Sequence, residues 1–256
     1  MKIVVCVKTT LPSEAQVRVE GGQLVFDNTP QIINPWDEYA VEAALQQKEA
    51  LGGTVTALSL GNEQANVALK HALAMGADDA IRIGDPALAA IDTLAAARLL
   101  AAAIRKLGGV DLVCFGRQAI DGDSGVTPAQ TARLLGWPAL TLASAVKIEA
   151  GQIRVERSIE EGRQIVTAAL PAVLSVVKDF AEPRYPTFMG KRKADRAEIP
   201  VWSLADLGLP APAALVTWGE FSEPPRRTAQ CEMIAGASPA EIAEKLADKI
   251  LAEKIL

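Results

Sequence analysis

Runs of apolar residues alternate with amphipathic stretches over the first half of the chain. The runs predict strands at residues 2–7, 54–60, 79–83 and 110–115. The amphipathic stretches predict helices at residues 38–51, 64–75 and 93–106, ended by Gly52, Gly76 and Gly108. Asp37 and Asp92 are expected to cap the first and third of these helices. A small hairpin is expected between residues 11 and 28, turning at Gly21 and Gly22.

This alternation predicts the fold class. Continuously apolar strands are typical of parallel strands that are covered on both faces by helices. We therefore expect an α/β fold with a doubly wound parallel sheet and right-handed crossovers. In such sheets ligands bind outside the carboxyl ends of the strands, so Val7, Leu60 and Phe115 should border one crevice.

Residues 116–138 are the most informative stretch. A strand leads into a turn of small and acidic residues, and Thr127 then offers a helix N-cap with Pro128 at the first helical position. The first turn of a helix has N–H groups without intrahelical partners and carries about half a positive charge. The stretch therefore predicts an anion site that holds a nucleotide.

The pattern changes after residue 138. Four strands joined by short turns are predicted at residues 140–148, 152–157, 164–169 and 172–177, with alternation that indicates antiparallel hairpins. A proline-rich arm spans residues 210–230, and a final helix begins at Ser238 and Pro239. Its apolar face is formed by Ile242, Leu246, Ile250 and Leu251. We expect a nucleotide-binding domain over residues 1–209, including a β-rich segment at 140–178. Residues 210–256 should form an arm and a helix that pack on a partner.

Composition narrows the class of protein. The 256 residues carry a net charge of −5, with a pI near 5.1, which argues against nucleic-acid binding. No run of 18 apolar residues occurs, so no membrane insertion is expected. The N-terminal apolar run is too short for a signal peptide and reads as a first strand. Three scattered cysteines favour buried thiols and a cytoplasmic location.

The candidate chemistry is binding and not catalysis. The chain has no GxGxxG after its first strand and no GxxxxGK[ST] motif. The chain has a single histidine, His71, so no transition-metal site is expected near Asp121 and Asp123, although Mg²⁺ bound through a phosphate stays open. We favour carboxylates that bond a ribose hydroxyl or backbone N–H groups. Ser124 has no histidine partner for a nucleophilic triad.

A second candidate surface lies near residue 190. Phe188 and Met189 precede a basic run, Lys191, Arg192 and Lys193, on what we expect to be an exposed loop. Large apolar side chains beside a cationic patch are typical of a docking surface.

Nine short motifs occur in a family order along nearly the whole chain. They are Asn34-Pro35-x-Asp, ALAMGAD at 72–78, GRQAIDGD at 116–123, GWP at 136–138, VER at 155–157, LPAV at 170–173, EPRYP at 182–186, GKRKA at 190–194 and EPPRRTA at 223–229. With this set the chain resembles the β subunits of electron-transfer flavoproteins, the family that includes the FixA proteins.

The resemblance implies an adenine-nucleotide α-hydrolase-like fold and a heterodimer with an α subunit. The α subunit would hold most of the redox FAD, and this chain would bind AMP structurally. In flavin-bifurcating members a second FAD takes the place of AMP. Electrons would come from acyl-CoA dehydrogenases or similar flavoenzymes, as in fatty acid oxidation, and pass to a quinone oxidoreductase or another acceptor. The chain would be an electron carrier without substrate turnover of its own, with NADH oxidation possible only in a bifurcating complex.

The same resemblance assigns the site residues. The nucleotide should contact Cys6, Asn34, Pro35, Trp36, Asp37, Leu60, Gly116, Gln118, Asp121, Gly122, Asp123, Ser124, Gly125, Val126 and Thr127. The partner flavoenzyme should dock on Phe188, Met189, Lys191, Arg192 and Lys193. Arg157 should support folding or the subunit contact.

Two departures from the family pattern leave alternatives open. Residues 125–128 read Gly-Val-Thr-Pro where non-bifurcating members often have Asn-Gln-Thr-Gly, and Ser158 stands where an acidic residue often follows the arginine. Residues 92–95 and 116–123 look more like bifurcating members, so we favour AMP but keep a second FAD as the alternative. A stand-alone adenine-nucleotide regulator of the universal-stress type would leave residues 140–178 and the arm unexplained. An ATP-using ligase would need a pyrophosphate-binding motif, which this chain lacks.

Overall fold

The computed structural model describes all residues except 27, 89–90, 218, 224, 226–230 and 254–256. The chain forms two compact units, Met1–Glu220 and Phe221–Leu256. The first unit includes Leu215 and Val216, which lie in the expected arm. There the Asp92 carboxylate accepts the backbone N–H groups of Leu215 at 2.7 Å and Val216 at 3.2 Å.

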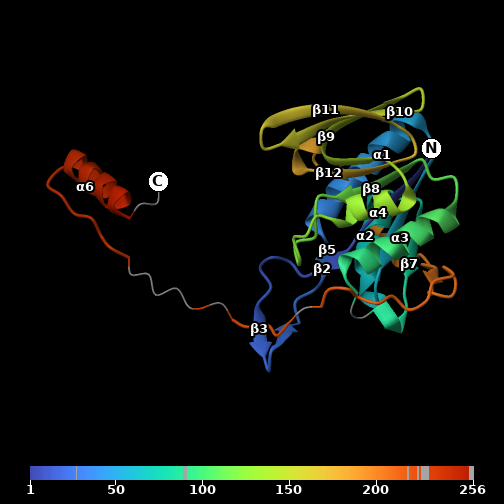
Figure 1. Ribbon diagram of the computed structural model, residues 1–256, viewed down its shortest axis with the longest axis horizontal. Helices are drawn as coiled ribbons and strands as arrows, with labels where there is room; N and C mark the ends of the chain where they lie inside the picture. The colour runs from blue at the N-terminus through green and yellow to red at the C-terminus, as the bar shows by residue number, and fades with distance from the viewer. Residues whose placement is uncertain (27, 89–90, 218, 224, 226–230, 254–256) are drawn as a thin grey trace. The chain divides into compact units, whose positions relative to one another are not determined.

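A sheet of nine strands, counted over the described residues, organises the first unit (Figure 1). In spatial order its strands are β11 (Gly162–Ala169), β10 (Gln152–Ile159), β9 (Ala139–Glu149), β12 (Ala172–Val176), β8 (Leu112–Gly116), β1 (Lys2–Cys6), β6 (Thr54–Leu60), β7 (Asp79–Ile83) and β13 (Val201–Trp202). From β9 to β13 every neighbouring pair is parallel. The expected parallel sheet is confirmed.

Helices cover both faces of the sheet. One hydrophobic cluster joins the sheet to α1 (Pro35–Leu51) and α2 (Asn66–Met75), and a second cluster joins it to α3 (Thr93–Leu107) and α4 (Thr127–Leu135). Alanine-rich helix faces allow this close packing, as at Ala40 and Ala103, which are fully buried. Each large side chain that is fully buried, such as Ile3 or Leu58, contributes roughly 1.5–3 kcal/mol relative to exposure. The fold is doubly wound, as the alternating pattern predicted.

The strands after residue 138 follow the prediction except for the last one. β9, β10 and β11 form an antiparallel meander at one end of the sheet (Figure 1). β12 does not extend this meander, because it inserts between β9 and β8 and runs parallel to both. All five of its residues are buried, so it behaves as a core strand and not as a hairpin strand with one wet face.

Several smaller elements complete the first unit. They are β2 (Thr9–Thr10) with β5 (Ile32–Ile33), the hairpin of β3 (Val17–Glu20) and β4 (Gln23–Phe26), the 3₁₀ helices η1 (Glu63–Ala65), η2 (Pro86–Leu88) and η3 (Lys178–Phe180), and α5 (Phe188–Asp195). The hairpin around Gly21 and Gly22 is confirmed. The prediction of a loop at residues 188–193 is wrong, because these residues lie in α5. Thr187 caps this helix by accepting the N–H of Gly190 at 2.9 Å.

The second unit contains α6 (Pro239–Ala252), the expected terminal helix. Ser238 caps it by accepting the Glu241 N–H at 3.3 Å. Lys245 donates to the Ala235 carbonyl, so the preceding segment lies against the helix. The apolar face stays exposed: Ile242, Leu246, Ile250 and Leu251 are 36%, 46%, 37% and 63% exposed. Its packing on a partner stays a prediction. Among the helices of the described residues, none could cross a membrane.

Candidate functional site

The candidate crevice lies where the strand order reverses. From β1 the chain moves to β6 and β7 on one side and then returns to β8 on the other side of β1. The carboxyl ends of β1 and β8 are therefore adjacent, with Cys6 paired to Phe115. Strand ends at such a switch point are where ligands bind in doubly wound sheets.

Asn34 fixes the loop that follows β8. Its side-chain amide donates to the Gln118 carbonyl at 2.8 Å, and its side-chain oxygen accepts the Ile120 N–H at 3.2 Å. Its backbone N–H donates to the Lys8 carbonyl at 2.8 Å. Asn34 is 1% exposed. One buried amide thus ties together the end of β1, the start of α1 and residues 118–120.

Gly116 allows α1 to approach the end of β8. A Cβ atom at this position would lie 2.6 Å from the Trp36 carbonyl oxygen and 2.5 Å from Oδ1 of Asp37. Contacts this short do not occur for real side chains, and the carbonyl is backbone that cannot rotate away. The identity of residue 116 is therefore set by the close packing of the site's two main elements.

Asp37 lies at the same junction. Its Oδ2 accepts the Lys8 backbone N–H at 2.8 Å, so Asp37 does not cap α1 as expected; the helix begins at Pro35 with Asn34 before it. Burial raises the pKa of Asp37 from 3.8 to about 7. Hydrogen bonds from the Lys8 backbone, the Asn34 side chain and the Gly116 backbone lower this pKa, as does the Lys8 charge, but they offset burial only in part.

The residues that follow β1 and β8 are polar and charged. Lys8 Nζ pairs with Asp121, at 2.7 Å to Oδ1 and 2.6 Å to Oδ2. Gln118 donates to Asp123 Oδ1 at 2.8 Å, and Asp123 has a φ of 46°. The Arg117 guanidinium lies 5.6 Å from the centre of the Trp36 ring. An ammonium group and a guanidinium therefore flank the loop, together with the Asp121 and Asp123 carboxylates.

The start of α4 differs from the prediction. The residue preceding the helix is Val126, and no side chain caps the first turn, so Thr127 is not the N-cap. Pro128 lies in the first turn as expected. The first turn of a helix has N–H groups without intrahelical partners. Without a side-chain cap, this helix start is available to an anion.

The structure brings several of the predicted contact residues together at the carboxyl ends of β1 and β8. Asn34, Asp37 and Gly116 are buried there, and Asp121–Ser124 are exposed in the loop that follows β8. Contact of these residues with a nucleotide stays a prediction. Cys6 is the last residue of β1. Burial is the main cause that raises the pKa of its thiol well above the usual value, and the Asp37 charge adds to this shift. Leu60 ends the neighbouring β6 and is half-buried. The sequence interpretation missed Lys8 and Arg117. Arg117 directly follows β8 and Lys8 stands two residues after β1, so a search of the strand ends could have found both.

The predicted docking residues lie on α5, which packs on α2. Phe188 and Met189 are 78% and 69% exposed, and Lys191, Arg192 and Lys193 are exposed beside them. A Cβ at Gly190 would lie 2.3 Å from the Ala74 carbonyl oxygen, so α5 packs tightly on α2.

Arg157 makes contacts within the chain. It donates to the Thr141 carbonyl at 2.8 Å, to Thr141 Oγ1 at 3.1 Å and to Gln164 Oε1 at 2.9 Å. These bonds join β9, β10 and β11 at the irregularity beside Glu156 and Arg157.

No group of three or more His, Cys, Asp or Glu side chains is arranged to hold a metal ion in the part of the chain that the structure describes. Cys6 and Cys114 are buried free thiols, and Cys231 is exposed.

A switch point of a doubly wound sheet, with polar loops at the strand ends and a helix start without a side-chain cap, is where nucleotide-binding α/β proteins hold their ligands. The family model described as "Electron transfer flavoprotein domain" matches residues 22–207. The chain is 36% identical over 273 residues to "Electron transfer flavoprotein subunit beta" of Megasphaera elsdenii, with both chains covered completely. It is also 36% identical over 265 residues to "Caffeyl-CoA reductase-Etf complex subunit CarD" of Acetobacterium woodii, again with complete coverage of both.

A further relative is "Protein FixA" of Azotobacter vinelandii, at 38% identity over 217 residues, covering 82% of this chain and 77% of the relative. The chain belongs to the electron transfer flavoprotein family, among its β subunits and FixA proteins. Its role is therefore in electron transfer, in a flavin-containing complex with an α subunit and oxidoreductase partners.

Proposed function

We propose that this chain is the AMP-binding β subunit of a cytoplasmic electron-transfer flavoprotein. It would accept electrons from an acyl-CoA dehydrogenase-type flavoenzyme and pass them to a quinone oxidoreductase or a similar acceptor. FAD, bound mainly by the α subunit, would supply the redox chemistry. This chain would complete the flavin's surroundings and hold AMP as a structural nucleotide.

The observation that carries the AMP proposal is the uncapped start of α4 at the switch point. The residues present fit a nucleotide phosphate: the first turn of α4 has no side-chain cap, and Gly125, just before it, has a φ of 62°. Asp121 and Asp123 are exposed on the rim, where carboxylates can accept ribose hydroxyls. The Lys8 ammonium and the Arg117 guanidinium supply positive charge beside the loop.

The crevice residues favour holding a nucleotide over transforming it. The side chains tied into the crevice base, Asn34 and Asp37, are already bonded to backbone groups of the chain. Burial raises the pKa of the Cys6 thiol, which disfavours the nucleophilic thiolate.

A second FAD in the same crevice is the alternative. Residues 92–95 and 116–123 resemble bifurcating members, and in that case NADH oxidation by the complex would be expected. One of the relatives, CarD, is named as a subunit of a reductase–Etf complex, which supports a flavoenzyme of CoA esters as the redox partner.

The nucleotide content of the purified complex tests the proposal. The chain is co-expressed with its α subunit, the heterodimer is denatured, and the released nucleotides are quantified. One FAD and one AMP per heterodimer is the expected result. Two FAD molecules without AMP would establish the alternative, and FAD alone would show that the crevice does not hold a nucleotide.

A further inference from the structure

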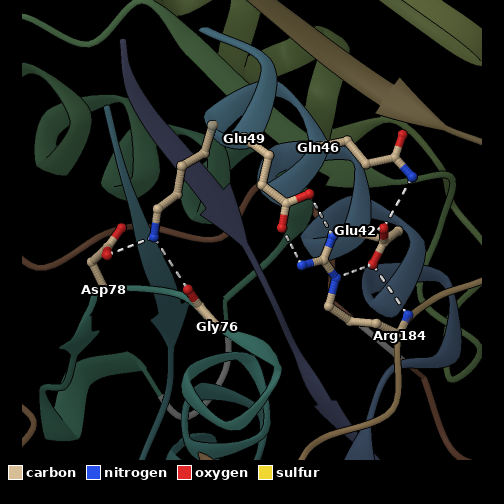
Figure 2. A network of polar contacts seen from close by, with 7 residues as sticks. Glu42, Gln46, Glu49, Gly76, Asp78 and Arg184 are labelled. Carbon is tan, nitrogen blue, oxygen red and sulfur yellow. Dashed lines mark hydrogen bonds and ion pairs between the residues drawn. The ribbon is translucent and has the colours of Figure 1, made fainter. Parts of the chain in front are cut away.

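A row of carboxylates runs along one face of α1. Glu38, Glu42 and Glu49 lie close to one line on the helix because they are four and seven residues apart. Glu38 pairs with His71 of α2 at 2.8 Å. Glu42 and Glu49 both bind Arg184, which belongs to the segment between η3 and α5 (Figure 2).

Arg184 is held by both of its carboxylate partners at once. Its Nε donates to Glu42 Oε2 at 2.8 Å, and Nη2 donates to Glu42 Oε1 at 3.0 Å and to Glu49 Oε2 at 3.1 Å. Nη1 donates to Glu49 Oε1. The Arg184 backbone N–H also donates to Glu42 Oε2, at 3.1 Å. Figure 2 shows the guanidinium between the two glutamates.

This ion pair differs from an ordinary surface pair. The Glu42 side chain is only 6% exposed and also accepts from Gln46 at 3.0 Å. Burial raises the pKa of Glu42, but the bonds from Arg184 and Gln46 outweigh it and lower the pKa. Removing the arginine would leave a buried carboxylate without its counter-charge, whereas most exposed ion pairs contribute little.

The clasped segment leads directly into exposed apolar side chains. Tyr185 is 87% exposed, Phe188 78% and Met189 69%. A second anchor follows, where the Thr187 cap and the close approach of Gly190 to the Ala74 carbonyl fix the start of α5. The three exposed side chains therefore lie between two anchors, one on α1 and one on α2.

We propose that Arg184 is a positioning residue for docking: by clasping Glu42 and Glu49 it holds Tyr185, Phe188 and Met189 in the orientation that the partner flavoenzyme binds. This proposal rests on the proposed role of Phe188 in docking. A segment ordered before binding loses less conformational entropy in the complex, so the clasp raises affinity without contacting the partner.

The experiment uses the heterodimer with its α subunit and an acyl-CoA dehydrogenase as electron donor. Arg184→Gln removes the charge, Arg184→Lys keeps the charge but cannot span both carboxylates, and Glu49→Gln removes only the exposed half of the clasp. Arg163→Gln is the matched control, because it removes an arginine–glutamate pair, to Glu156, in the meander. Phe188→Ala tests the docking role itself.

Two measurements separate positioning from a general loss of stability. With each variant heterodimer as the electron acceptor, kcat of the dehydrogenase and its KM for the heterodimer are determined. Hydrogen exchange is followed over residues 181–189. For Arg184→Gln we expect a KM about tenfold higher, or 1.4 kcal/mol, with kcat and nucleotide content unchanged. Hydrogen exchange over residues 181–189 should be faster in Arg184→Gln than in wild type. The KM values and exchange rates of Arg184→Lys and Glu49→Gln should lie between those of Arg184→Gln and wild type.

The outcomes separate the two proposals. Unchanged KM in Arg184→Gln, with a raised KM in Phe188→Ala, would overturn the positioning role and leave docking intact. An unchanged KM in Phe188→Ala would overturn docking at this surface, and the positioning role with it. If Arg184→Gln fails to fold, Glu49→Gln decides: a KM equal to that of Arg163→Gln would overturn the proposal.

Discussion

Two helices that begin at proposed functional surfaces start in different ways. α5, which carries Phe188 and Met189, has its first turn closed by the Thr187 hydroxyl. α4, beside the crevice, has threonine at its start as well, but Thr127 makes no cap. The same residue type thus closes one helix start and leaves the other open.

The difference follows from what each helix start must contact. The proposed docking surface would work through exposed side chains, so its backbone can be satisfied internally, with Arg184 as a proposed anchor. A crevice for an anion needs backbone N–H groups that are left for the ligand. Such a site must be held rigid by buried contacts beneath it. Here these contacts are made by the buried Asn34 and by the close approach of α1 at Gly116.

The largest expected effect on stability is at Gly116. A substitution there tests whether the close packing of α1 on the end of β8 holds the proposed nucleotide site in place. Gly116→Ala would place a Cβ 2.6 Å from the Trp36 carbonyl oxygen, so α1 or β8 must shift. We expect a loss of about 3 kcal/mol in the free energy of unfolding, at the upper end of overpacking costs, together with loss of nucleotide. Urea denaturation measures the first effect, and nucleotide extraction the second.

Gly122→Ala is the control, because a Cβ at Gly122 meets no atom within 4 Å. Its stability should stay within about 0.5 kcal/mol of wild type. If both variants unfold at the same urea concentration, the close approach at Gly116 does not matter for the fold.

Asn34→Ala should have the next largest effect. It leaves the Gln118 carbonyl and the Ile120 N–H without their buried partner, which costs about 2 kcal/mol. Nucleotide retention should fall more than stability, because the released loop forms the crevice wall. Asn62→Ala, which removes an exposed side-chain cap on η1, serves as comparison and should leave nucleotide content unchanged.

Asp37 gives the crevice a pH dependence that α5 should lack. Burial raises its folded-state pKa to about 7, above 3.8 in the unfolded chain, so the folded protein binds the proton more tightly between pH 4 and 7. This group's contribution to stability is complete below pH 4 and is lost as the pH rises toward 7. The expected change is about 1.4 kcal/mol between pH 5 and 6.

The measurement is the difference in unfolding free energy between wild type and Asp37→Asn, taken at half-unit steps from pH 4 to 8. Other carboxyl groups titrate equally in both proteins and cancel. A difference that does not change with pH would mean that Asp37 is ionised throughout this range.

The smallest effects compare the two threonines directly. Thr187→Ala removes a side-chain cap and should cost about 1 kcal/mol. Thr127→Ala removes no cap and should change stability by less than about 0.5 kcal/mol. If thermal unfolding shows equal losses of stability in the two variants, the two helix starts do not differ in side-chain capping.

Local sequence signals were enough for the elements that depend on local chemistry. The Asp92 cap of α3 is confirmed by its bond to the Ala95 N–H, and so are the helix start at Ser238 and Pro239 and the hairpin at Gly21 and Gly22. The alternation of apolar runs gave the doubly wound sheet because each run had to be buried between two helix layers. The family motifs then identified the relatives.

Elements that depend on distant partners were missed or misread. β13 has only two residues and forms because Val201 and Trp202 meet β7 at the sheet edge. The basic run at 191–193 was expected on a loop because it is strongly polar, but packing of Gly190 on α2 and the Thr187 cap make it helical. Residue type alone predicts Thr127 and Asp37 as caps, but Val126 precedes α4 and Asn34 precedes α1, and the Asp37 carboxylate bonds the distant Lys8 N–H instead.

The sequence by itself determined the order of the main strands and helices of the first half, the parallel sheet and the family, because these follow from periodic burial and from motifs that are read in one dimension. Only the tertiary structure decided that Asn34 holds residues 118–120, that Lys8 pairs with Asp121, and that Arg184 clasps Glu42 and Glu49. Each of those contacts joins residues at least 84 positions apart. The direction of a side chain toward a distant partner depends on how the elements pack, and no local pattern encodes it.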